Sequence, residues 1–151
     1  MIPLHDRRIV LIGGAGFIGH HLALRLAAGG ASVTLVDGLC VNNLLHYETG
    51  DDLIVNRAMY RRMIGQRLDL LRAQGIPLHV LDARDLPALS SLLGEIEPHV
   101  VIHLAGMAHA ARCNRDPQHA FEHTLRTLQN SITAGGPSLE HFVYFSSSMV
   151  Y

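Results

Sequence analysis

A glycine-rich turn at residues 13–19 constrains this chain more than any other stretch. It reads Gly-Gly-Ala-Gly-Phe-Ile-Gly, follows the apolar run 9–12 and precedes a helical pattern. It fits Gly-x-Gly-x-x-Gly from Gly14, and Asp37 ends the next apolar run about 20 residues on. Glycines let a backbone approach a diphosphate closely, and the amides and dipole of the next helix favour negative charge. This strand–turn–helix unit predicts a dinucleotide site; the alternative is a glycine-rich turn without a ligand.

The composition is that of one globular domain. Of the 151 residues, 48% are hydrophobic and 17% are charged, and the net charge of -1 gives no field that would favour nucleic acid or an anionic membrane. Cys40 and Cys113 cannot build a disulfide framework and match no zinc spacing. The apolar runs are far short of a membrane span, and the N-terminus lacks a signal-peptide pattern. We therefore expect a cytoplasmic protein without a metal, nucleic-acid or membrane partner.

Short apolar runs alternate with helical patterns along the whole chain. Strands are expected at residues 9–12, 33–36, 78–82, 100–104 and 142–145. The alternation predicts the α/β class, with a Rossmann-like, doubly wound parallel sheet of order 3-2-1-4-5, truncated after strand 5. A ligand then lies over the carboxyl ends of the strands. That edge would hold the glycine turn, Asp37, Asp82, residues 104–106 and residues 146–148.

Two long helical segments carry further expectations. Residues 38–75 are long for a crossover, which favours a loop followed by a substantial helix. A solvated helix face, or alternatively a phosphate or partner surface, is expected for Arg57, Arg61, Arg62, Arg67 and Arg72. A later helix begins at Asp116 and Pro117. Its buried side is expected to carry Phe121, Thr124, Leu125 and Leu128.

Three residues at strand ends have chemistry that the pattern can address. Asp37 is placed to accept hydrogen bonds from both hydroxyls of an adenosine ribose. Its carboxylate would repel the 2′-phosphate of NADP, and no arginine follows directly to offset this charge, so NAD is favoured. The alternative is that Asp37 bonds only its own turn. Asp82 could accept from the adenine amino group or serve as a capping or loop acid. His103 lies in an apolar run and is expected to be a hydrogen-bonded core histidine.

Three serines, at residues 146–148, follow the fifth predicted strand. No Gly-x-Ser-x-Gly elbow surrounds them, which argues against a hydrolase nucleophile. A hydroxyl that orients a substrate alcohol during hydride transfer fits better. Polar residues that simply end a strand are the alternative.

Together these residues resemble the N-terminal half of an extended short-chain dehydrogenase/reductase, the group of NAD-dependent nucleotide-sugar epimerases and dehydratases. The resemblance covers nearly the whole chain and is carried by the glycine turn, Asp37, Asp82, and residues 103–106 and 145–151. It implies that the NAD pyrophosphate is lined by Gly13, Gly16, Phe17, Ile18 and Gly19. It implies that Asp37 binds the adenine ribose and that Asp82 and Ala83 contact the adenine. It also implies that Leu104, Ala105 and Gly106 contact the inner ribose of the cofactor. In the family, the catalytic Ser or Thr stands four residues before the Tyr of a Val-Tyr-Gly segment. The resemblance therefore implies that Ser147 is the catalytic serine.

The chain departs from the family pattern at three points. Ala83 replaces a larger aliphatic residue, and residues 124–128 stand where the family shows an Asn and then Gly-Thr. All twelve basic residues are arginines, so the family's Tyr-x-x-x-Lys pair is absent. We therefore expect residues 1–151 to be the NAD-binding Rossmann domain of a longer protein. That protein would be an epimerase or dehydratase that acts on a nucleotide sugar, and it is a candidate homodimer. The chain alone would be inactive. The alternative is a non-catalytic NAD-binding sensor or scaffold module.

Overall fold

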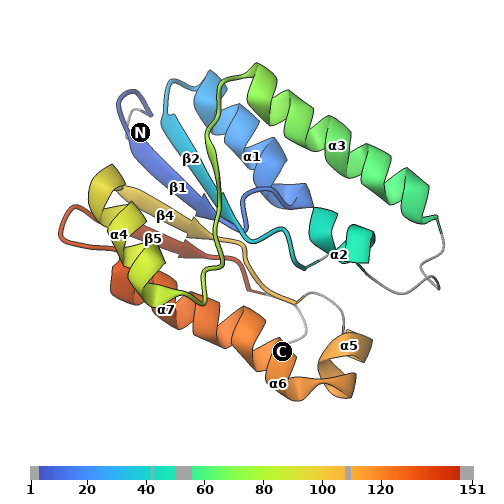
Figure 1. The fold of residues 1–151 in the computed structure, drawn as a ribbon. Helices are drawn as coiled ribbons and strands as arrows, with labels where there is room; N and C mark the ends of the chain where they lie inside the picture. Colours follow the sequence, from blue (N-terminus) through green and yellow to red (C-terminus); the bar gives the residue numbers. More distant parts are fainter. Residues whose placement is uncertain (1–3, 42, 50–55, 108–109, 147–151) are drawn as a thin grey trace.

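A parallel five-stranded sheet forms the centre of the described structure. The computed structural model describes residues 4–41, 43–49, 56–107 and 110–146. The strands are β1 (Arg8–Ile12), β2 (Ser32–Asp37), β3 (Leu78–Val80), β4 (Val100–His103) and β5 (His141–Tyr144). All neighbours pair in parallel, in the order β3-β2-β1-β4-β5 (Figure 1). The predicted fold class and strand order are therefore confirmed.

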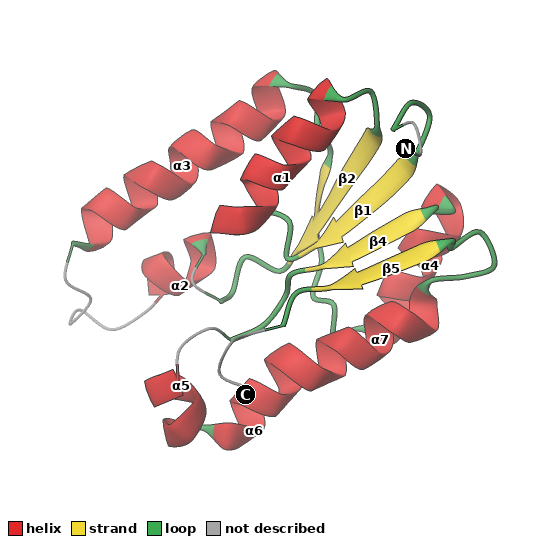
Figure 2. Ribbon diagram, turned by 180° about the vertical axis from the view of Figure 1, so that it is seen from behind, coloured by secondary structure: helices red, strands yellow, loops and turns green. Residues whose placement is uncertain are grey.

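Helices cover both faces of this sheet. The helices are α1 (Phe17–Ala28), α2 (Leu44–Thr49), α3 (Arg57–Ala73), α4 (Leu86–Ile96), α5 (Ala110–Arg115), α6 (Pro117–Phe121) and α7 (Thr127–Ala134). A π-helical turn, Glu122–Arg126, joins α6 to α7. In Figure 2, α1 and α3 lie on one side of the sheet and α4 and α7 on the other. The short helices α2 and α5 were not predicted from the sequence.

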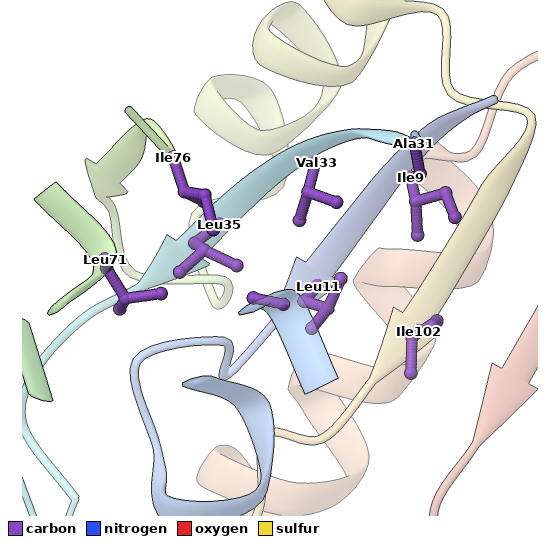
Figure 3. Close-up of a cluster of buried hydrophobic side chains, with 9 residues drawn as sticks. Ile9, Leu11, Ala31, Val33, Leu35, Leu71, Ile76 and Ile102 are labelled. Atoms are coloured by element: carbon purple, nitrogen blue, oxygen red, sulfur yellow. The ribbon is translucent and has the colours of Figure 1, made fainter. Parts of the chain in front are cut away.

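The two helical layers bury alternate residues of the central strands. Ile9 and Leu11 of β1 join the cluster on the α1 and α3 side, whereas Val10 and Ile12 join the cluster on the α4 and α7 side. Figure 3 shows the first cluster, in which Leu71 reaches the sheet from α3. Fully burying such side chains contributes about 1.5–3 kcal/mol each. Burial on both faces explains why β1 is a continuous apolar run rather than an alternating one.

The strand register aligns the ends of the strands along one edge. Ile12 pairs with Val36 on one side and with His103 on the other, and His103 pairs in turn with Tyr144. Because all strands run in parallel, the segments that follow these four residues leave from the same edge of the sheet. The predicted ligand-binding segments of the described chain therefore lie close together.

The buried side of the α6–α7 segment differs from the prediction. Phe121 and Leu125 were expected inside, but they are 45% and 51% exposed. The π-helical turn adds a residue to one turn and so rotates the face that meets the sheet. The buried side instead carries His123, Thr127, Asn130, Ser131 and Ala134. The expectation is wrong for Phe121 and Leu125, because apolar spacing does not report a π-helical turn, whereas Thr124 and Leu128 are half-buried.

Candidate functional site

The glycine turn packs directly against the segment that follows β4. Gly13 has a φ of 79°, and a Cβ atom added to it would lie 2.6 Å from the amide nitrogen of Ala105. A Cβ atom on Gly19 would collide with the backbone of Gly14. Glycine is therefore required at these positions by conformation and by space. The turn and residues 104–105, both predicted for the site, are thus in contact.

The N-terminus of α1 has no side-chain cap. Its N-cap residue is Gly16, and its first turn carries no acidic residue. By contrast, Asp85 caps α4 and Asp116 caps α6, each accepting the backbone amide of the third residue on, at 3.0 and 2.9 Å. The side chains of Phe17 and Ile18 are more than half exposed. The open amide end of α1 therefore fits an anionic group such as the diphosphate of a dinucleotide.

The carboxylate of Asp37 lies beside the glycine turn. Its Oδ2 atom accepts the amide of Ala15 at 3.0 Å, and its Oδ1 atom accepts the amide of Leu39 at 2.8 Å. The alternative that Asp37 bonds only its own turn is therefore wrong. Burial raises the pKa of Asp37, while these two amides and the charge of Arg67 lower it. Each oxygen keeps a second acceptor position, so two hydroxyl groups could still bind.

Two side chains from the long β2–β3 connection also hold this turn, at the carbonyl of Ala15. The carbonyl oxygen of Ala15 accepts Nδ2 of Asn43 at 3.2 Å and Nη1 of Arg67 at 3.0 Å. Asn43 is only 2% exposed, and Arg67 is half-buried. The expectation of a solvated helix face is therefore wrong for Arg67. Sequence reasoning missed both contacts, since no spacing distinguishes Arg67 from the other arginines of α3.

Asp82 is paired within its own loop. Its carboxylate accepts the backbone amide of Arg84 at 2.9 Å and the Nε of the same residue at 2.9 Å. The hydrogen bonds from Arg84 hold the pKa of Asp82 below its usual value. Because Asp85 caps α4, Asp82 is a loop acid rather than a cap, and its contact with adenine stays a prediction. The next residue, Ala83, is buried, and its carbonyl accepts Nδ2 of Asn130 at 3.0 Å.

Residues 104–107 leave β4 next to the glycine turn. The amide of Leu104 donates to Ile12 O at 2.7 Å, which continues the sheet by one bond. The amide of Met107 donates to Oγ1 of Thr124 at 3.1 Å. A Cβ atom on Gly106 would meet the Thr124 side chain at 3.7 Å. Thr124, which belongs to the segment that departs from the family pattern, thus supports this turn.

His103 is a core histidine, as predicted. It is fully buried, and its Nδ1 lies 3.0 Å from Oγ of Ser131, which itself donates to Thr127 O at 2.6 Å. Since Ser131 already donates its proton, this network assigns the histidine proton to Nδ1. Burial lowers the pKa of His103 to about 4. The residue is therefore neutral at physiological pH and fastens β4 to α7.

The catalytic role of Ser147 stays a prediction. Ser147 lies outside the described residues, while its neighbour Ser146 is exposed, two residues after β5. Among the described residues, no group of three His, Cys, Asp or Glu side chains could hold a metal ion. No helix in the part of the chain that the structure describes is long and apolar enough to cross a membrane.

Known proteins resemble this chain in sequence and in structure. The model of the NAD dependent epimerase/dehydratase family matches residues 9–151. The UDP-glucose 4-epimerase uge1 of Schizosaccharomyces pombe is 26% identical over 100% of this chain and 38% of its own length. The dTDP-L-rhamnose 4-epimerase of Burkholderia thailandensis is 27% identical over 96% of this chain and 36% of its own length.

A solved structure extends the comparison to three dimensions. It is the UDP-glucose-4-epimerase from Stenotrophomonas maltophila with bound NAD and formylated UDP-arabinopyranose, which is 25% identical with a TM-score of 0.71. The match covers 97% of this chain and 38% of that one. The chain thus spans less than two-fifths of the length of these relatives.

Proposed function

The chain belongs to the NAD dependent epimerase/dehydratase family, and on this basis we propose that it binds NAD as the cofactor-holding part of a nucleotide-sugar epimerase or dehydratase. One observation carries the proposal: the open amide end of α1 stands beside the Asp37 carboxylate, whose Oδ2 atom accepts the amide of Ala15. This pairs a cradle for a diphosphate with an acceptor for ribose hydroxyls. The NAD in the S. maltophila epimerase structure supports the same assignment.

Each part of the sheet edge has a role in this proposal. The amides of Phe17 and Ile18 stabilise the diphosphate, and Asp37 accepts the hydroxyls of the adenine ribose. Asp82 and Ala83 border the adenine, and residues 104–106 border the inner ribose. NAD, when bound, supplies the hydride acceptor for transient oxidation of a sugar hydroxyl. Ser147 orients that hydroxyl, as the family resemblance implies.

Turnover needs groups that this chain does not contain. A Tyr-x-x-x-Lys pair is absent because the chain has no lysine, and we infer that residues 1–151 alone bind the cofactor without converting substrate. Because the relatives named above are epimerases, they favour an enzyme over a non-catalytic module. By their names, these relatives differ from each other in both the sugar and the base of the nucleotide.

A homodimer is part of the same proposal. The α6–α7 segment exposes three apolar side chains, Phe121, Leu125 and Ile132. Their burial against a second copy would remove them from water. Light scattering that gives the mass of a single chain at every concentration would contradict this assembly.

Calorimetric titration with NAD tests the cofactor assignment. We expect the protein to bind NAD and Asp37→Ala to weaken binding about tenfold or more, since hydrogen bonds to a charged group contribute about 1.5–3 kcal/mol. Ser147→Ala is the control, and it should keep the NAD affinity because the proposed role of Ser147 concerns the sugar. Absence of heat at millimolar NAD, or equal affinity of Asp37→Ala, would overturn the proposal.

A further inference from the structure

Arg67 differs from the other arginines of α3 in where its guanidinium lies. Nη2 of Arg61 lies 3.6 Å from Oε1 of Glu48, and Nη1 of Arg72 lies 2.7 Å from Oδ1 of Asp69. All four of these side chains are well exposed. Arg67 instead reaches inward from α3, which lies alongside α1 (Figures 1 and 2), and donates to Ala15 O at 3.0 Å. The carbonyl of Ala15 in the glycine turn thus binds a cation from a distant part of the sequence.

The guanidinium of Arg67 is held among groups that respond to its charge. Burial lowers the pKa of Arg67, and the negative charge of Asp37 opposes that effect. Arg67 in turn lowers the pKa of Asp37 and of the nearby His20. Arg67 and Asp37 both lie in the described part of the chain, and they form no direct ion pair there. Their charges therefore interact without direct contact, while both groups bind Ala15 of the glycine turn.

The hydrogen-bonding capacity of Arg67 is largely unused. An arginine carries five N–H donors in a planar fork. Within the described part of the chain, one of them is bound, to the carbonyl of Ala15. That carbonyl also accepts from Asn43, so both of its lone pairs are occupied. The remaining donors of Arg67 have no acceptor among the described residues and can take one from a ligand.

We propose that Arg67 is a second determinant of dinucleotide selectivity, acting with Asp37 at the adenosine ribose. The inference rests on the proposed function, in which Asp37 accepts the ribose hydroxyls. While Asp37 is ionised, its charge repels a 2′-phosphate and Arg67 only offsets that charge. Once Asp37 is replaced by a neutral residue, the fork of Arg67 binds the 2′-phosphate of NADP, because a guanidinium matches phosphate geometry. The absence of an arginine directly after Asp37 therefore understates the capacity of this site for NADP.

A double-mutant cycle measured by calorimetry tests the inference. Asp37→Ala should raise NADP affinity relative to NAD at least tenfold over wild type, and adding Arg67→Gln should remove most of that gain. NAD affinity should differ by less than threefold between Asp37→Ala and Asp37→Ala/Arg67→Gln. Arg72→Gln, on the exposed part of the same helix, is the matched control and should leave the gain intact. Rising salt should weaken NADP binding by Asp37→Ala more steeply than NAD binding.

Two further results separate the inference from its alternatives. Arg67→Lys keeps the charge but loses the fork, so with Asp37→Ala it should give an intermediate NADP affinity even if Arg67→Gln does not fold. Equal NADP affinity with Arg67 and with either substitution, at unchanged melting temperature, would overturn the inference while NAD binding by wild type leaves the proposed function standing. A wild-type protein that binds neither dinucleotide would overturn both.

Discussion

Two turns leave the middle of the same sheet edge, and different chemistry holds each of them. The turn after β1 is held by ionisable groups, the carboxylate of Asp37 and the guanidinium of Arg67, on the amide and carbonyl of Ala15. The turn after β4 is held by neutral groups. Thr124 accepts the amide of Met107, and His103 fastens the strand itself to α7.

This difference indicates separate tasks for two turns that pack against each other. Charged side chains with unused donors and acceptors can bind a charged ligand. Protonation of a buried neutral network, by contrast, lowers the stability of the fold. We infer that the turn after β1 determines what binds, and that the turn after β4 supplies a fixed wall. Substitutions in the two turns should therefore have different effects.

The largest loss of stability is expected for Gly13→Ala in the turn after β1. The positive φ and the contact with Ala105 should together lower the free energy of unfolding by about 3 kcal/mol or more. Urea unfolding measures this. Gly94→Ala is the matched control, because nothing lies within 4 Å of its added Cβ in α4, and it should raise stability by about 0.5–1 kcal/mol. Equal effects of the two substitutions would show that the turns do not need this close contact.

The next effect is a pH dependence on the β4 side. The pKa of His103 falls from about 6.5 in the unfolded chain to about 4 in the folded chain. Its contribution is therefore complete above pH 6.5 and is lost as pH falls from there towards 4. Between pH 7.5 and pH 5 this amounts to about 2 kcal/mol.

His103→Asn tests this contribution because its amide can keep a bond to Ser131 but cannot titrate. Urea unfolding at both pH values should show a smaller loss of stability for the variant than for wild type, by roughly that amount. The other histidines are common to both proteins and cancel in the difference. An identical loss would mean that His103 does not couple folding to pH.

The smallest effect is expected for Thr124→Val, which removes the acceptor for the Met107 amide. We expect a loss of about 1 kcal/mol in the free energy of unfolding. The NAD affinity should change much less than in Asp37→Ala. Thr133→Val, on an exposed part of α7, should change stability by no more than about 0.5 kcal/mol. A larger effect of Thr124→Val on NAD than on folding would contradict a supporting role for the second turn.

The sequence predicts the parts of this molecule that depend on local pattern. The order of the sheet follows from alternating runs, and the proximity of Asp37 to the glycine turn follows from their spacing. Arg67 escapes prediction because its contact depends on how the 38–75 connection folds back over α1. The partner of Asp82 also escapes, since a loop acid can pair with its own neighbour, and the buried side of α7 depends on a π-helical turn that apolar spacing does not reveal.

Amide chemical shifts can report whether the open end of α1 binds the diphosphate of NAD, as we propose. In a ¹H–¹⁵N NMR titration with NAD, we expect large shifts for the amides of Phe17 and Ile18. The amides of Ala88 and His119, which are already bonded to Asp85 and Asp116, should stay unchanged. Unchanged amides at Phe17 and Ile18 in the presence of saturating NAD would contradict the claim.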